Sequence, residues 1–220
     1  MILTLLLACT GARPTDTADT SDTSAGDTSG TADVPCTPWL PWDVPGATWA
    51  YADADGALTV TYTAEGPVVW DYGVHASLAI RYWQDGTSVH AGRTFFACTA
   101  EGLAMVGSDT ANDGLRYVTL IEPPALWMPR DPAVGDTWGA ASEAAMDVYD
   151  ADGVLLDRDG APLEYTMSAV GTEEVVAPAG TFATLLVDFE GTVQAHADGV
   201  GLVRIAQGTS TALLAAYDVP

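Results

Sequence analysis

The sequence predicts an all-β fold, an antiparallel meander that forms a curved sheet, a half-barrel or a sandwich. Three observations indicate it. The 22 Gly and 13 Pro residues interrupt the chain at short intervals, the segments between them alternate apolar and polar side chains, and Asp-Gly pairs fall where tight hairpin turns are expected. Disorder throughout is excluded, because 48% of the residues are apolar and can bury a core.

The first nine residues form a short apolar run that ends in Ala8 and Cys9. Such a run is typical of an export signal with its cleavage site, and Leu6-Leu7-Ala8-Cys9 resembles the lipobox of bacterial lipoproteins. The resemblance implies that residues 1–8 are a signal peptide that is removed and that Cys9 carries fatty acyl chains such as palmitate. Signal peptides usually have about 15–30 residues and a basic start, so we expect the true start codon to lie upstream. A buried apolar strand with an incidental cysteine is the alternative.

Residues 9–35 are predicted to be the lipidated cysteine and a disordered tether. Beyond Cys9 the segment consists almost entirely of Thr, Asp, Ser, Ala and Gly, so it has too little apolar surface to offset the entropy of ordering. Similar tethers follow the acylated cysteine in many lipoproteins of Gram-negative bacteria. In that family a residue other than Asp after the cysteine, here Thr10, implies sorting to the outer membrane. The expected contact with the membrane is therefore through lipid alone.

Cys36 and Cys98 remain as a pair once Cys9 is assigned to lipid. In the oxidising compartment that an export signal implies, such a pair predicts a disulfide. Closing this loop would stabilise the folded domain by about 4 kcal/mol in the chain-entropy model. Two unpaired thiols are the alternative, and a metal site has less support because no Cys-x-x-Cys motif or histidine pair accompanies the cysteines.

Residues 36–220 are predicted to be one all-β globular domain. Alternating or β-branched apolar runs predict strands at residues 68–74, 78–82, 163–169, 184–193 and 201–205. Asp-Gly pairs predict hairpin turns at Asp55-Gly56, Asp85-Gly86, Asp152-Gly153 and Asp159-Gly160. The best helix candidate, residues 140–146, is rich in Ala but short, and it fits a strand equally well.

One motif occurs twice in this domain. Gly46-Ala47-Thr48-Trp49 recurs as Gly135-Asp136-Thr137-Trp138, and each copy follows a Pro-containing segment. An Asp-rich turn sequence comes after each copy, at residues 53–56 and 150–153. The repetition has two explanations with equal support. One is a domain of two similar halves of about 90 residues each, 36–125 and 126–220, and the other is chance reuse of turn sequences.

The second half also resembles a group of uncharacterised secreted bacterial β-proteins. Their pattern G-D-T-W, V-x-P-A-G-T-F and G-V-G-L-V is matched at residues 135–138, 176–182 and 199–203, although Asp198 stands where that group commonly has Pro. The resemblance implies a curved antiparallel sheet, similar to the half-barrels of periplasmic lipid carriers. It implies no activity.

The formal net charge of −23, from 30 acidic residues and seven Arg, excludes one class of function. Nucleic-acid binding requires basic side chains against the phosphates, so it is not expected. Five of the acidic residues and one Arg lie before residue 36, which leaves 25 acidic residues and six Arg, a charge of −19, on residues 36–220. This charge argues against the domain lying flat on an anionic membrane.

Sequence motifs of catalysis are missing. The three histidines are scattered, and the chain contains no nucleophile elbow, phosphate-binding loop or dinucleotide fingerprint. We therefore expect no enzymatic activity and no cofactor. Calcium is a candidate ligand at Asp150, Asp152 and Asp157, but a complete calcium loop needs further ligands, and hairpin turns explain these Asp-Gly pairs without metal.

Aromatic residues are the remaining candidates for ligand binding. Exposed rings at Trp70 and Trp83, on neighbouring predicted strands, would stack on sugars or line an apolar cleft, and packing in the core is the alternative. The expected function is that of a lipid-anchored, non-catalytic binding or scaffolding module of the bacterial cell envelope, at the outer membrane. A carrier of an apolar ligand in a half-barrel and a carbohydrate-binding module are the alternatives, and a hydrolase has less support. The expected partner is an envelope protein, a glycan or an apolar ligand.

Overall fold

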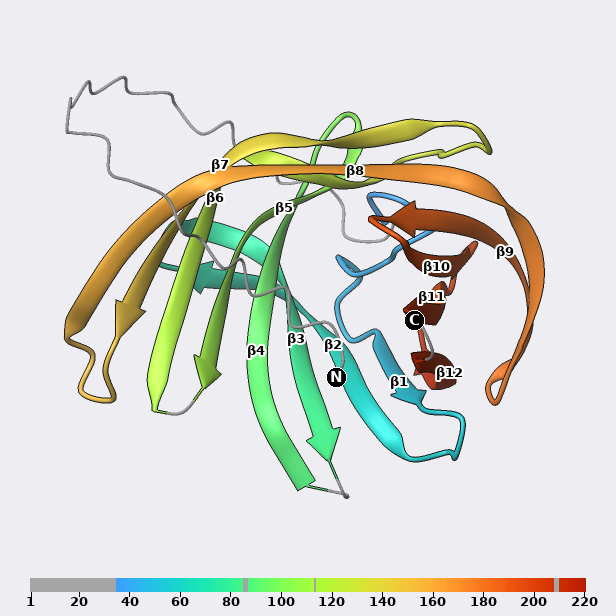
Figure 1. Cartoon of the computed structure of the whole chain (residues 1–220), viewed down its shortest axis with the longest axis horizontal. Coiled ribbons are helices and arrows are strands. Elements are labelled where there is room, and N and C mark those ends of the chain that lie inside the picture. Colours follow the sequence, from blue (N-terminus) through green and yellow to red (C-terminus); the bar gives the residue numbers. More distant parts are fainter. Residues whose placement is uncertain (1–34, 85–86, 113, 208–209) are drawn as a thin grey trace.

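Twelve β-strands make up the regular structure of the residues that this computed structural model describes, 35–220 apart from 85–86, 113 and 208–209 (Figure 1). Each strand pairs antiparallel with the strands before and after it in the sequence, as expected for a meander. The strands are β1 (Thr48–Ala52), β2 (Leu58–Trp70), β3 (Gly73–Gln84), β4 (Thr87–Cys98), β5 (Gly102–Asn112), β6 (Leu115–Pro129), β7 (Thr137–Tyr149), β8 (Leu155–Ala177), β9 (Gly180–Phe189), β10 (Thr192–Ala197), β11 (Gly201–Gln207) and β12 (Ser210–Asp218).

The predicted all-β antiparallel fold is confirmed, and the sheet closes on itself. β1 pairs with β12, with Thr48 opposite Asp218 and Ala52 opposite Leu213, so the hydrogen-bonded ladder runs around a closed barrel. The predicted half-barrel would have left these two strands as edges. Closure pairs the backbone N–H and C=O groups that edge strands would expose. The closure was not predictable from local sequence patterns, because β1 and β12 are far apart in the sequence.

Two of the predicted Asp-Gly hairpin turns form, and they are built in the same way. The aspartate that opens each turn, Asp53 or Asp150, accepts the backbone N–H groups two and four residues later through Oδ1. Each turn contains a glycine with a positive φ, Gly56 (82°) or Gly153 (80°), a conformation that glycine adopts at little cost. The division into two halves stays a prediction, and its boundary between residues 125 and 126 falls within β6.

Three local predictions are wrong. Residues 184–193 are not one strand, because β9 ends at Phe189 and β10 begins at Thr192. Asp159-Gly160 is not a turn, because it lies inside β8, where Gly160 pairs with Ala145 of β7. Residues 68–74 are not one strand, because β2 ends at Trp70 and β3 begins at Gly73. In all three places pairing with a neighbouring strand decides the conformation, and local propensity is overridden. The Asp85-Gly86 pair lies outside the described residues.

The helix candidate at residues 140–146 forms part of strand β7. Within the described ranges, no helix has the length and apolar character needed to cross a membrane.

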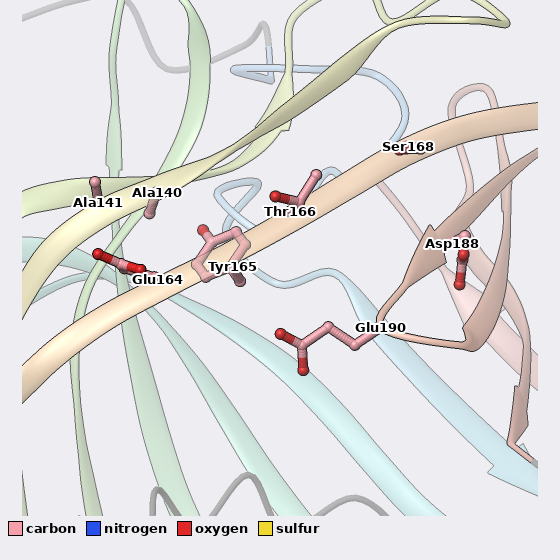
Figure 2. A pocket seen from close by; sticks show the side chains of 8 residues that line it. All are labelled: Ala140, Ala141, Glu164, Tyr165, Thr166, Ser168, Asp188 and Glu190. Atoms are coloured by element: carbon pink, nitrogen blue, oxygen red, sulfur yellow. The ribbon is translucent and has the colours of Figure 1, made fainter.

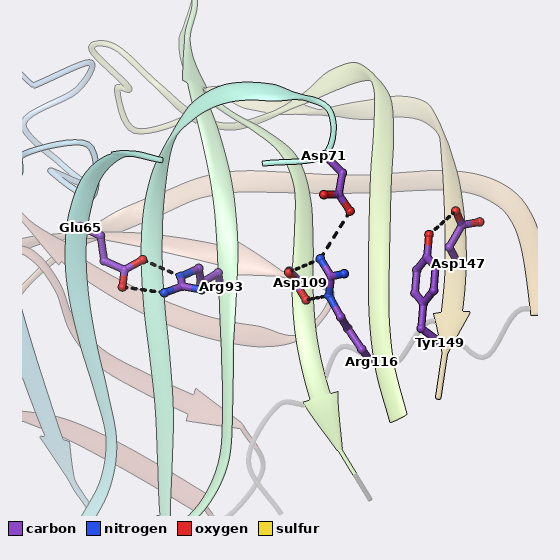
Figure 3. A network of polar contacts seen from close by, with 7 residues as sticks. All are labelled: Glu65, Asp71, Arg93, Asp109, Arg116, Asp147 and Tyr149. Atoms are coloured by element: carbon purple, nitrogen blue, oxygen red, sulfur yellow. Dashed lines mark hydrogen bonds and ion pairs between the residues drawn. The ribbon is translucent and has the colours of Figure 1, made fainter. Parts of the chain in front are cut away.

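The β2–β3 and β8–β9 hairpins each bend at a bulge. The register shifts between Ala64 and Gly66 in β2 and between Ala169 and Gly171 in β8. Beyond its bulge, β2 packs over β4 and β5 through Trp70, which contacts Phe95 and Val106. Figure 3 shows Asp71 in the turn that follows. The turn after β8 reaches β12 in a comparable way, because the backbone N–H of Ala179 donates to the carbonyl of Leu214. A bulge increases the local twist and bends a strand, which explains how both hairpins cover their neighbours.

The main core fills the inside of the barrel. Its largest fully buried side chains come from strands on all sides, among them Trp49, Tyr51, Phe96, Met167 and Leu214. Trp49 Nε1 donates to the carbonyl of Val200, and the Tyr51 hydroxyl donates to the carbonyl of Leu202, so both polar ends are satisfied. The core is therefore a packed interior rather than an open lumen.

The segment before β1, residues 35–47, contributes to this core. Leu40 is fully buried, and Trp42 packs against Tyr62 of β2 and Phe96 of β4, with ring centroids 5.5 and 5.4 Å apart. On the other side of the segment, the carbonyl of Pro38 accepts the N–H of Gly199 in the turn between β10 and β11. The chain that leads out of the predicted tether thus enters the middle of the barrel and bridges its two sides.

Candidate functional site

The larger surface depression lies on the outer face of β7, β8 and β9, next to the β9–β10 turn. It has a volume of about 610 Å³ and is lined by Ala140, Ala141, Glu164, Tyr165, Thr166, Ser168, Asp188 and Glu190 (Figure 2). Glu164, Thr166 and Ser168 are alternate residues of β8, so the pleat directs all three to the same side. The sequence showed this alternation, but it did not show that the β9–β10 turn closes one side of the surface.

The chemical character of this depression is that of a hydrogen-bond acceptor. Three carboxylates and two hydroxyl groups line it, together with two alanines and Tyr165. The Tyr165 ring faces the core and its hydroxyl donates to the carbonyl of Leu126, so it offers no free donor to the depression. Carboxylates and hydroxyls in this arrangement can accept hydrogen bonds from the hydroxyls of a sugar or from cationic groups.

Glu190 occupies an unusual position at the rim of the depression. It has a φ of +49° and is followed by Gly191 with a φ of +82°, the combination found in a two-residue hairpin turn. Asp188 Oδ1 accepts the N–H of Gly191 at 2.9 Å and holds the turn in shape. The Glu190 side chain extends from this turn over the depression (Figure 2).

A smaller depression of about 360 Å³ lies between the segment before β1 and the bent end of β8–β9. Its lining consists of Trp39, Thr172, Glu173, Glu174, Ala183 and Thr184. Glu173 is held by Arg204, with 2.7 Å between Oε2 and Nη2, and this contact lowers the pKa of the Glu173 carboxyl. Trp39 is half-buried here and is the aromatic side chain of this surface.

Four arginines of the described residues are bound by carboxylates. The pairs are Arg93 with Glu65, Arg116 with Asp109 and Asp71, Arg158 with Asp147, and Arg204 with Glu173, and Figure 3 shows the first two of these groups beside the Tyr149–Asp147 hydrogen bond. The arginine partner is the main cause of a lowered pKa for Glu65 and for Asp147. Such partly exposed pairs contribute about 0–1 kcal/mol each to stability. They also mean that these arginines do not neutralise the carboxylates of the larger depression.

The two histidines whose side chains the structure describes contact no hydroxyl nucleophile. His75 Nε2 lies 3.3 Å from the carbonyl oxygen of Tyr72. His196 is 1% exposed, and its Nε2 lies 3.1 Å from Oε1 of Gln194, while Nδ1 has no hydrogen-bond partner. Burial lowers the pKa of His196 to about 4, against a smaller opposing effect of the Trp39 backbone. This buried pair has no signal in the sequence, where Gln194 and His196 simply alternate with alanines.

The candidate calcium ligands are used by the fold. Asp150 Oδ1 accepts the backbone N–H groups of Asp152 and Val154, and Asp157 Oδ1 accepts the N–H of Arg158. The structure does not bring the carboxylates of Asp150, Asp152 and Asp157 together, since among the described residues the group with ligand atoms close enough for a metal is Cys36, Asp43 and Cys98. The two sulfurs of that group are bonded to each other. The hairpin turn therefore accounts for Asp150 and Asp152.

The interpretation of Trp70 as an exposed ligand platform is wrong. Its side chain is 7% exposed and stacks on Phe95 of β4, with 4.2 Å between ring centroids and 13° between the planes. With Val106 and Val118 these residues form a second, smaller core on the outer side of the sheet, under the bent β2–β3 hairpin. The alternating sequence around Trp70 indicates that one face of the strand is buried, but it does not identify the residues that bury it. The side chain of Trp83 lies outside the described residues.

The predicted pair of cysteines is joined. Cys36 and Cys98 form a disulfide with their Cα atoms 5.4 Å apart, which ties the segment before β1 to the end of β4. Cys9, residues 1–8 and the tether up to residue 34 lie outside the described residues, so lipidation at Cys9 stays a prediction.

Two solved structures are similar to this fold. One is described as an exported protein with a YmcC-like fold from Bacteroides fragilis, with a TM-score of 0.46 and 14% identity, covering 79% of this chain and 96% of that chain. The other is described as a lipoprotein from Parabacteroides distasonis, with a TM-score of 0.44 and 17% identity, covering 84% of this chain and 100% of that chain. Neither a family model nor a curated protein matches the chain.

Proposed function

We propose that this protein is a lipid-anchored module of the bacterial cell envelope that binds or holds a partner without catalysis. The observation that carries the proposal is the way the chain enters the fold. Directly after the predicted tether, Cys36 is bonded to Cys98 and Leu40 and Trp42 pack in the core. The predicted tether is therefore joined to the folded barrel through a covalent bond and buried side chains.

The packed core supports surface binding over the carrier alternative. An apolar ligand in a half-barrel needs an enclosed apolar cavity, but aromatic side chains such as Trp49 and Phe96 and the segment around Leu40 occupy the interior. The larger depression is lined by carboxylates and hydroxyls instead. Its acceptor groups suit a partner that donates hydrogen bonds or carries positive charge.

The anchor is tested at Cys9. In a Gram-negative host that expresses the full gene, labelled palmitate should enter the protein, and the protein should sediment with the outer membrane. Cys9→Ala should abolish both label and sedimentation, whereas Cys9 intact with Thr10→Asp should keep the label and move the protein to the inner membrane, as the lipoprotein resemblance implies. A Cys9→Ala protein that still sediments with membranes would refute the lipid anchor.

Carbohydrate binding is the second candidate, and the larger depression favours it. Glu164 and Thr166 project side by side from β8, and paired acceptors of this kind can bind neighbouring sugar hydroxyls. Envelope polysaccharide in a native gel should retard the wild-type protein, and the double variant Glu164→Gln with Thr166→Ala should migrate freely. Glu143→Gln, an exposed carboxylate of β7 outside the depression, is the matched control and should still be retarded. Equal migration of all proteins with and without polysaccharide would eliminate this candidate and leave a protein partner.

A further inference from the structure

The two sulfurs of the Cys36–Cys98 disulfide have unlike surroundings. Cys36 is 1% exposed and belongs to the main core. Cys98 is the last residue of β4 and is exposed. Access is one of the factors that decide which sulfur of a disulfide an external thiolate attacks. A thiolate that approaches from solvent therefore meets Cys98 first.

A carboxylate lies against both sulfurs. One oxygen of Asp43 and the Sγ atoms of Cys36 and Cys98 all lie within 4.8 Å of one another. Oδ2 of Asp43 accepts the backbone N–H of Cys36 at 2.8 Å, whereas Oδ1 is buried and has no hydrogen-bond partner. Burial raises the pKa of Asp43, and the hydrogen bond from Cys36 offsets this only in part. Asp43 thus lies beside both sulfurs and has one buried oxygen without a hydrogen-bond partner.

An arginine is bound to the residue that follows the exposed cysteine. Arg130 Nη2 donates to the carbonyl of Thr99, the residue after Cys98, at 3.2 Å. The same charge acts on the carboxylate of Asp43. A neighbouring arginine favours the thiolate form of a cysteine, and the thiolate is both the nucleophile and the leaving group in thiol–disulfide exchange.

We propose that Cys36–Cys98 is a thiol–disulfide exchange site, with Cys98 as the attacked cysteine, Cys36 as the resolving cysteine and Asp43 as the group that carries the proton of Cys36. The co-reactant is a dithiol, such as the reduced pair of a protein oxidoreductase. One of its thiolates bonds to Cys98 Sγ, the Cys36–Cys98 bond breaks, and its electron pair passes to Cys36 Sγ, which takes a proton from the Asp43 carboxyl. The second thiolate of the dithiol then attacks its own partner sulfur and releases Cys98.

The reaction balances as an exchange. The dithiol, reacting as two thiolates, is oxidised to a disulfide; Cys36 becomes a thiol with the proton from Asp43, and Cys98 leaves as a thiolate that takes a proton from water. In the closing direction the Asp43 carboxylate takes the proton of the Cys36 thiol, and the Cys36 thiolate displaces the co-reactant from Cys98. Opening would release the covalent tie between β4 and the segment that leads to the tether. The chemistry does not depend on the lipid anchor, so it is tested separately from the proposed function.

The closing step is the one to measure. The full chain carrying Cys9→Ser, which leaves only the two barrel cysteines, is reduced and mixed with oxidised glutathione, and samples quenched with acid are analysed by mass spectrometry. In the parent protein glutathione should attach at Cys98 and be displaced rapidly by Cys36. Asp43→Asn keeps an oxygen for the N–H of Cys36 but cannot accept a proton, so displacement should be about 100-fold slower at pH 7 and the mixed disulfide should accumulate.

The pH dependence separates proton transfer from a structural role. The difference between Asp43→Asn and the parent should shrink above about pH 8.5, where a free thiol ionises unaided. Asp136→Asn is the matched control, because Asp136 also accepts a loop N–H, that of Ala133, but is not in the group formed by Asp43 and the two sulfurs. This variant should behave as the parent. Equal displacement rates for Asp43→Asn and the parent, a slowing that is the same at every pH, or attachment of glutathione mainly at Cys36 would each overturn the proposal.

A second measurement does not require the variant to fold. In the parent protein the displacement rate should rise by much less than tenfold per pH unit between pH 6 and pH 8, because Asp43 takes the proton of the Cys36 thiol in place of hydroxide. A rate that rises about tenfold per pH unit over this range would mean that Cys36 ionises without help, and it would also overturn the assignment of Asp43.

Discussion

Acidification from pH 7 to pH 5 should destabilise the barrel through His196. The side chain is 1% exposed, and its pKa of about 4 in the folded protein lies below the ordinary value of 6.5. Between these values the unfolded chain binds a proton that the folded chain does not. Stability therefore increases with pH in this window, is fully present above pH 6.5 and is lost as the pH falls towards 4.

The size of the effect follows from the two pKa values. A difference of about 2.5 units corresponds to about 3 kcal/mol over the whole window, at about 1.4 kcal/mol per unit. About 2 kcal/mol of this should be lost between pH 7 and pH 5. Glu65, Asp147 and Glu173, whose pKa values are lowered, lose their contributions only below about pH 4.5. Asp43, whose pKa is raised, has the opposite sign, because protonation favours the fold.

Urea unfolding of the oxidised protein at intervals from pH 7 to pH 5 measures this loss. His196→Gln should flatten the dependence of the free energy of unfolding on pH, whereas His75→Gln, at a half-buried histidine on the outer side of the sheet's second core, is the comparison variant and should change this dependence less. A parent protein whose free energy of unfolding changes by less than about 0.5 kcal/mol over this range would refute the reasoning, as would a His196→Gln variant with the parent slope.

Three further predictions concern stability. Replacing Cys36 and Cys98 together by Ser should lower the free energy of unfolding by about 4 kcal/mol, because the sequence separation of 62 residues makes a long open loop, and an unchanged urea midpoint would contradict this. Gly107→Ala should cost about 1–3 kcal/mol, since the added Cβ would meet the Trp70 ring and the Thr119 carbonyl; an unaltered thermal midpoint would show that Trp70 does not pack there. Glu190→Asn should gain about 1 kcal/mol, because Asn tolerates the φ of +49° better than Glu, and a lower thermal midpoint would argue against this turn.

Local chemistry was enough to predict several elements. The turns at Asp53 and Asp150 form because one aspartate can bond the backbone two and four residues later, which is a property of the segment alone. The strand at residues 163–169 alternates in burial as its sequence does, with Leu163, Tyr165 and Met167 facing the core. Both predictions need no knowledge of what lies across the sheet.

The candidate site was less predictable. Glu164, Thr166 and Ser168 are ordinary outward residues of a strand, and they become a surface only because the β9–β10 turn places Asp188 and Glu190 beside them. Asp43 is equally unmarked in the sequence, and its role depends on a loop that returns its carboxylate to Cys36. Such groupings depend on the positions of segments that are distant along the chain.

The sequence by itself determined the class of structure, because the period of two, the turn residues and the cysteine pair act over short distances or through a covalent bond. Tertiary structure alone decided the closure of β1 on β12, the burial of Trp70 under its own hairpin and the packing of the segment around Leu40 in the core. The physical reason is that an alternating strand records only that one face is covered. Which partner covers it is selected by the packing of the whole sheet.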